Sequence, residues 1–163
     1  MPNRPSLLQP LADALASTFG SEFRIADDGA LHLATQDGRT ISAGCSPDGQ
    51  DIVFHSVLAV LDGPHDLVRM TAALACNLHQ EQTCGGAIGL DVTSGALVFS
   101  WRIPGADASE ALLMTSLDGY CATVEALANR LDEAEAALSP EEAVALAQRS
   151  RAASSLDRHS HLL

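Results

Sequence analysis

Apolar residues recur along this chain with two different spacings, which predict where helices and strands lie. Spacings of three and four residues are typical of helices and occur over residues 7–18, 65–82 and from about 109 onward. Short apolar runs bounded by turn residues predict strands at 31–33, 40–43, 52–61, 88–90 and 97–103. Asp-Gly pairs between the first three runs favour an antiparallel meander. The order predicts an α+β fold, a compact α-β-β-β-α-β-β-α domain around a twisted antiparallel sheet.

A second helix start follows the last long helix. Ser139, Pro140 and Glu142 are the residue types that cap and begin a helix. They predict a short C-terminal helix that ends near Arg149, and the residues after it have the composition of a flexible tail. We therefore divide the chain into a domain over residues 1–137 and a C-terminal helix with its tail over residues 138–163.

The strand predicted at 52–61 is apolar on both faces. One face carries Ile52, Phe54, Leu58 and Val60. The other face carries Val53, Val57, Ala59 and Leu61. A strand with one solvated face should carry polar residues at alternate positions. Either the strand is central with a helix on each face, or one face meets a second subunit or a bound peptide.

The helix predicted at 65–82 has an apolar arc wider than one core contact requires. One side carries Leu67, Met70, Thr71, Leu74 and Leu78. The arc is extended by Val68, Ala72, Ala75 and Cys76. The helix is either buried in its own core, or it packs on its own sheet with one side and on a second subunit with the other.

The charge of the chain narrows its possible partners. The 163 residues include 21 acidic and 9 basic side chains, which gives a formal net charge of -12. This excess disfavours nucleic acid, whose phosphates need clustered cations, and it disfavours anionic membranes. No apolar run approaches the roughly 20 residues that cross a bilayer, and the N-terminus lacks a signal-peptide core. We expect a cytoplasmic protein that does not insert into membranes.

The sequence offers no strong catalytic or metal-binding motif. The cysteines lack the spacing of paired metal ligands and are interpreted as reduced thiols: Cys45, Cys76, Cys84 and Cys121. His79 lies near two of them, but carboxylates that could complete a zinc site are not obvious. The acidic end of the last long helix, at residues 132–135, is interpreted as solvated. We expect neither an enzyme nor a bound metal or cofactor.

One motif spans the second helix and the last two strands. It comprises Leu74-Ala75-Cys76-Asn77-Leu78, then Gly85-Gly86, Ile88-Gly89-Leu90-Asp91, a turn, Leu97-Val98-Phe99-Ser100 and Arg102-Ile103-Pro104. Together with the order of elements, the small size and the acidity, this motif resembles the class I type III secretion chaperones, the CesT/SycE-like family of bacterial pathogens and symbionts. The resemblance covers roughly residues 6–135, so the predicted C-terminal helix is an addition to the family pattern.

This resemblance implies a homodimeric, ATP-independent chaperone of the bacterial cytoplasm. Such a protein binds the N-terminal chaperone-binding segment of a secreted effector in extended form and keeps the effector competent for secretion. An extended chain can add a strand to a sheet edge and insert alternate side chains into pockets. By position, the resemblance places the dimer interface at Leu67, Met70, Leu74, Leu78 and Leu90. It places the effector-binding pockets at Leu11, Leu15, Val53 and Val57.

Two other interpretations fit the same residues. One is a dimeric YbjN-like regulatory or scaffold module that has the same α+β layout and no secretion role. The other is a small thiol-dependent or hydrolytic enzyme. An enzyme should present a concave pocket with convergent polar groups, whereas a chaperone should present exposed apolar surfaces without one.

Overall fold

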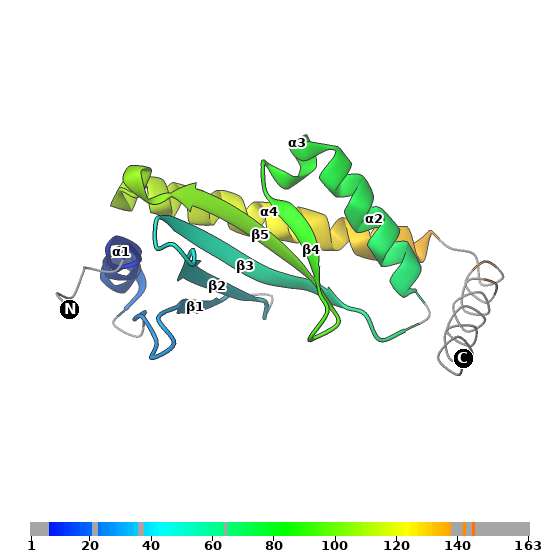
Figure 1. Cartoon of the computed structure of the whole chain (residues 1–163), viewed down its shortest axis with the longest axis horizontal. Helices are drawn as coiled ribbons and strands as arrows, with labels where there is room; N and C mark the ends of the chain where they lie inside the picture. The colour runs from blue at the N-terminus through cyan, green and yellow to red at the C-terminus, as the bar shows by residue number, and fades with distance from the viewer. Residues whose placement is uncertain are drawn as a thin grey trace, which may run out of the picture.

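The computed structural model describes residues 7–20, 23–35, 38–63 and 65–137, together with Glu142 and Ala145. Its helices are α1 (Gln9–Phe19), α2 (Asp66–Leu78), α3 (Gln80–Thr83) and α4 (Glu110–Ala136), with a short 3₁₀ helix η1 (Gly105–Asp107). Its strands are β1 (Leu31–Ala34), β2 (Thr40–Cys45), β3 (Asp51–Val60), β4 (Ala87–Asp91) and β5 (Ala96–Pro104). The strands form one antiparallel sheet in the order β1-β2-β3-β5-β4 (Figure 1). The predicted α+β class and the predicted meander are confirmed.

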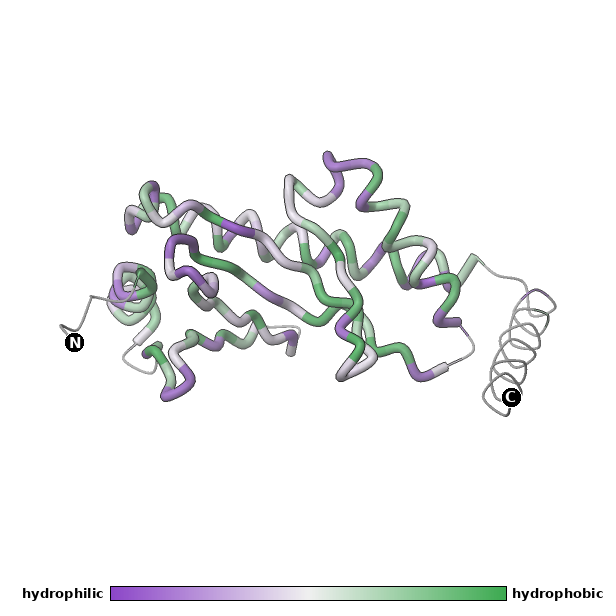
Figure 2. The backbone as a smooth tube through the Cα atoms, in the orientation of Figure 1, coloured by the Kyte–Doolittle hydropathy of each residue, from purple (hydrophilic) through white to green (hydrophobic). Residues whose placement is uncertain are grey.

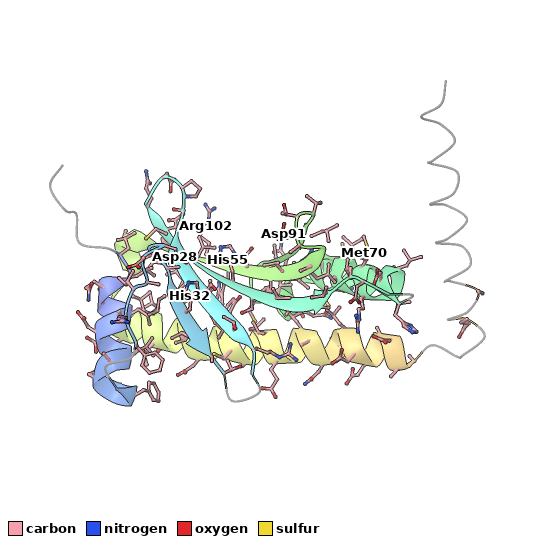
Figure 3. All side chains as sticks on the ribbon, turned by 90° about the horizontal axis from the view of Figure 1, so that it is seen from below. Asp28, His32, His55, Met70, Asp91 and Arg102 are labelled. Carbon is pink, nitrogen blue, oxygen red and sulfur yellow. The ribbon has the colours of Figure 1, made fainter. Side chains whose placement is uncertain are left out.

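The long helix α4 lies along one face of the sheet, with α1 near one end of it and α2 near the other (Figures 1 and 3). The core fills the space between this helix and the central strands, where Phe54 and Phe99 are fully buried. In Figure 2 the backbone is predominantly apolar along much of β3, which crosses this core. The other face of the sheet points away from α4, and Arg102 extends from it in Figure 3.

Helix α4 begins where its sequence places a cap. The side chain of Ser109 accepts a hydrogen bond from the backbone N–H of Leu112 at 3.3 Å, which satisfies one of the free donors of the first turn. Buried residues then recur at helical spacing from Leu113 to Leu131. The helix therefore places one continuous apolar side against the sheet.

Tyr120 lies at the centre of this contact and is fully buried. Its ring centroid is 5.2 Å from that of Phe54, 5.3 Å from that of Phe99 and 6.2 Å from that of Trp101. Its hydroxyl donates to the carbonyl oxygen of Phe99 at 3.1 Å. Burial raises the pKa of Tyr120 well above its usual value, so the hydroxyl remains a donor. This cluster joins α4 to the two central strands.

The alternation of side chains between the two faces of β3 is interrupted part-way along the strand. Its pairing with β5 slips between Val57 and Ala59, where a bulge interrupts the register. Ile52, Phe54 and Leu58 are buried as the alternation predicts, but Val60 is 50% exposed. The prediction that Val60 shares their face is wrong, because the bulge offsets the period of two. Among the described residues no helix covers the other face of β3, so the interpretation with a helix on each face is not supported.

The helix predicted over 65–82 is two helices. His79 has φ −101° and ψ 81°, which are not helical, and it separates α2 from α3. The chain then turns through Cys84 and Gly85, both with positive φ, before β4 begins. Residue 79 is a histidine, not a proline or glycine, so no helix-breaking residue in the sequence reveals this break. The helix predicted at 139–149 lies outside the described residues, apart from Glu142 and Ala145.

Gly86 is a position where any side chain meets the core. A Cβ placed there would lie 2.6 Å from two ring carbons of Phe99 and 2.7 Å from the carbonyl oxygen of Ser100. We expect Gly86→Ala to lower the free energy of unfolding by about 1–3 kcal/mol, measured by urea denaturation. The control is Gly89→Ala on β4, the strand that Gly86 directly precedes, where nothing lies within 4 Å. Equal stability of the two variants would contradict the close packing at Gly86.

Candidate functional site

Helix α2 presents a row of exposed leucines. Leu67, Leu74 and Leu78 are 47%, 66% and 79% exposed, and we call these three residues the α2 stripe. They recur at intervals of seven and four residues, so they share one side of the helix. Ala73 and Cys76 on the opposite side are buried against the core. The helix therefore uses one side for its own fold and leaves the other exposed to solvent.

The neighbouring strand β4 extends this apolar surface. Leu90 is 44% exposed and Val92, in the turn that follows, is 83% exposed. Met70 is half-buried and packs partly against the core. All five residues predicted for the dimer interface thus lie on α2 or β4, and four of them are exposed. Val92 belongs to the same region but was not predicted, because it lies in a turn and outside the helical spacing.

A side-chain amide joins α2 to β4. The Nδ2 of Asn77 donates to the backbone oxygen of Ile88 at 2.8 Å. The backbone N–H of Ile88 donates to the Oδ1 of Asn77, also at 2.8 Å. This pair of hydrogen bonds has the pattern that a neighbouring strand would make, and it holds the end of the α2 stripe beside β4. Sequence spacing did not identify it, because the partners are a helix residue and a strand backbone eleven positions apart.

The opposite end of α2 is fixed to α4 by an ion pair. One guanidinium nitrogen of Arg69 lies 2.7 Å from a carboxylate oxygen of Glu135, and the other donates to the backbone oxygen of Val60 at 3.3 Å. His65 lies 4.0 Å from the same carboxylate group. Glu135 is therefore half-buried and paired, which corrects the interpretation of this acidic helix end as simply solvated.

A second surface lies on the face of the sheet that points away from α4, which we call the open face. Val57, which is 50% exposed, pairs across the strands with Val98. Next along β3 lie the pair His55 and Ser100 and the pair Val53 and Arg102. A hollow of about 540 Å³ covers this part of the face. It is lined by Cys45, Ser46, Pro47, Val53, His55, Gly85, Gly86, Ala87, Ser100 and Arg102.

The polar groups of the open face do not form a reactive set. A guanidinium nitrogen of Arg102 lies 3.3 Å from a carboxylate oxygen of Asp51. The positive charge of Arg102 is therefore paired with a negative charge on the neighbouring strand. Burial lowers the pKa of His55, so its imidazole is neutral at pH 7. These groups can orient a polypeptide by hydrogen bonds, and the flanking valines can bind apolar side chains. The face thus offers contacts that could bind a polypeptide.

The residues predicted for effector binding separate into two groups. Val53 and Val57 lie on the open face, where Val57 is exposed and Val53 half-buried. Leu11 and Leu15 are 0% and 3% exposed in the core under α1. The resemblance placed these two leucines in the effector-binding pockets, but in this structure they face the core and offer no surface to a ligand. We do not propose them as contact residues.

The other candidate chemistry remains dispersed. Within the described ranges no group of three or more His, Cys, Asp or Glu side chains could hold a metal ion. Burial raises the pKa of the Cys76 thiol, which disfavours the thiolate that a nucleophile requires. No helix in the described part of the chain is long and apolar enough to span a membrane. The histidines of the tail, at 159 and 161, lie outside the described residues.

The fold is similar to chains in two solved complexes. One is a chain of the HopA1–SchA chaperone–effector complex, with a TM-score of 0.64 and 19% sequence identity over 78% of this chain and 99% of that one. Another is a chain of the ExsC–ExsE complex, with a TM-score of 0.52 and 12% identity over 80% of this chain and 92% of that one. At these identities the similarity establishes the fold. No curated protein matches the sequence.

A family model gives the assignment. The model of the Tir chaperone protein (CesT) family matches residues 10–128. The matched region runs from the start of α1 into the second half of α4, so it contains the five strands of the described residues and both exposed apolar surfaces. It covers well over half of the chain and stops before the C-terminal segment. This chain belongs to the Tir chaperone protein (CesT) family.

Proposed function

We propose that this protein is a cytoplasmic, ATP-independent chaperone that works as a homodimer and holds the N-terminal segment of a type III secreted effector in extended form. Membership of a chaperone family and the similarity to a chain of a chaperone–effector complex support the class of function. The observation that carries the proposal is the pair of exposed apolar surfaces, the α2 stripe and the open face. One surface serves the second subunit and the other serves the effector.

The α2 stripe, with Leu90 and Met70, forms the subunit contact. Fully burying a leucine side chain stabilises an association by about 1.5–3 kcal/mol. A helix with its other side in the core can meet the same helix of a second copy about a two-fold axis. The two hydrogen bonds of Asn77 keep β4 in line with α2, so that Leu90 and the stripe act as one surface.

The effector segment adds a strand at the free edge of β1. The backbone N–H of Thr35 donates to the backbone oxygen of Arg39. In an antiparallel pair every second residue bonds to the neighbouring strand, so the backbone groups of Leu33 and Leu31 bond to β2. The N–H and C=O groups of His32 and Ala34 then point outward. The side chain of His32 is held between Asp28 and Ser42 at 2.9 and 3.0 Å, which keeps this short edge in place.

Past that edge, the effector segment continues over the open face. Val53, Val57 and Val98 bind its apolar side chains, and the hollow beside them accommodates larger ones. An extended ligand makes main-chain hydrogen bonds at the edge and uses alternate side chains for specificity. This arrangement accepts many sequences, provided that they are apolar at the right intervals.

The test is co-purification from the native bacterium with wild-type protein and with Val57→Asp. We expect wild-type protein to retain a secreted protein whose N-terminal segment alone survives limited proteolysis. Because the aspartate places a charge among the valines, Val57→Asp should weaken binding of that segment about 10- to 100-fold by calorimetry. Ala122→Asp on the exposed side of α4 is the control and should bind normally. Purification without any secreted protein would favour the YbjN-like scaffold or regulatory module instead.

A further inference from the structure

Strand β4 forms the second edge of the sheet, and its outer backbone groups differ from those of β1. Both the N–H and the C=O of Ile88 are bonded to the side chain of Asn77, each at 2.8 Å. Ile88 is 7% exposed, so this pair of bonds is shielded from water. The amide of Asn77 therefore occupies the place that the backbone of an added strand would take.

Alternation along the antiparallel pair identifies the other outward groups of β4. Both backbone groups of Ile88 point away from β5. The backbone groups of the alternate residues therefore point toward β5, and these residues are Ala87, Gly89 and Asp91, which pair with Ser100, Val98 and Ala96. Leu90 is then the one further residue of β4 whose backbone points outward; its side chain, which the proposed subunit contact uses, stands off the face of the sheet and not along this edge. With Ile88 occupied, an incoming strand finds a single free residue here, which is too few for a stable ladder.

We propose that Asn77 is a specificity-determining residue that closes the β4 edge to extended polypeptide and so confines strand addition to β1. This inference rests on the proposed function in one respect, namely that the effector segment binds by strand addition. An open edge on a sheet recruits extended chains indiscriminately, including those of identical molecules. A sheet with one closed and one open edge binds a single strand in a defined place, whereas two open edges would divide the ligand between competing sites.

Asn77 is better suited to closing the edge than to serving as a general contact between helix and sheet. A hydrophobic residue at the end of α2 could pack on β4 equally well, but it would leave the N–H and C=O of Ile88 unpaired. Asparagine presents one donor and one acceptor in a plane, as a peptide group does. Aspartate could accept from the Ile88 N–H but could not donate to the Ile88 oxygen.

The test uses a synthetic peptide with the sequence of β5, residues 96–104, because β4 already pairs with this sequence in antiparallel register. Peptide is added to the full-length wild-type protein and to Asn77→Ala. Bound stoichiometry is measured by native mass spectrometry, and amide exchange of Leu90, His32 and Ala34 by NMR. We expect one peptide per wild-type protomer, with His32 and Ala34 protected. We expect a second peptide on Asn77→Ala, with exchange at Leu90 slowed about tenfold or more.

Two further variants separate edge closure from a structural role. Asn77→Asp retains the acceptor for the Ile88 N–H, and we expect partial peptide protection at Leu90 even if Asn77→Ala does not fold. Asn129→Ala removes an exposed asparagine on α4 and should behave as wild type. If folded Asn77 variants lose stability but bind no additional peptide and leave Leu90 unprotected, the proposal is overturned. Absence of protection at His32 and Ala34 in every protein would instead count against strand addition at β1.

Discussion

Replacing Leu74 and Leu78 together with aspartate is expected to convert the protein from a dimer into a folded monomer. These side chains are 66% and 79% exposed in the single chain, so their replacement removes little from its core. In the proposed dimer they are buried, and each leucine contributes about 1.5–3 kcal/mol to association. Because two are lost from each protomer, the dissociation constant should rise by at least about three orders of magnitude.

Sedimentation equilibrium gives the subunit state, and far-UV circular dichroism shows whether the fold remains. Leu112→Asp is the matched control, since Leu112 is an exposed leucine on α4, away from the α2 stripe. It should remain dimeric. A double variant that stays dimeric at micromolar concentration would move the subunit contact to another surface. A double variant that unfolds would mean that the monomer depends on its partner for stability.

Replacing Tyr120 with alanine is expected to destabilise the protein by about 3–5 kcal/mol, since a large ring is removed from a packed core. The cavity would lie between Phe54, Phe99 and Trp101, which belong to the two central strands and cannot collapse onto α4 without bending the sheet. Small domains have total stabilities of about 5–15 kcal/mol. The variant should therefore be close to unfolding at room temperature.

Tyr120→Phe separates the ring from its hydroxyl. It removes the hydrogen bond to the Phe99 oxygen while keeping the ring, and should cost about 0.5–1.5 kcal/mol. Urea denaturation of both variants and the wild type should be compared at one protein concentration, because dimerisation contributes to the apparent stability. A loss below about 1 kcal/mol for Tyr120→Ala would show that α4 is held to the sheet by other contacts.

The sequence was most informative where packing follows the regular period of an element. All five strands lie where alternation and turn residues predicted them, because Asp-Gly turns and β-branched runs act locally. The exposed side of α2 was also predictable, since its leucines recur at helical spacing. Val53 and Val57 were correctly associated with the face opposite Ile52 and Phe54.

Sequence reasoning was weakest where a tertiary contact interrupts the period. The bulge after Val57 exposes Val60, and the break at His79 divides one predicted helix, although neither residue is a typical breaker. Leu11 and Leu15 have the same spacing whether they face a ligand or the core, so their burial could only come from the fold. The two hydrogen bonds of Asn77 could be predicted only by knowing which strand lies beside α2.

The order of strands has a mechanical consequence for unloading. The β1 edge and the α2 stripe lie at opposite ends of the sheet, because β4, which adjoins α2, is its other edge. A strand pulled from β1 by one end peels away, and its hydrogen bonds break one after another under a small force. The proposed apolar subunit contact would have to separate as a whole and so would resist a larger force. If the effector binds as proposed, a secretion apparatus that pulls on the cargo would release it and leave the proposed dimer intact.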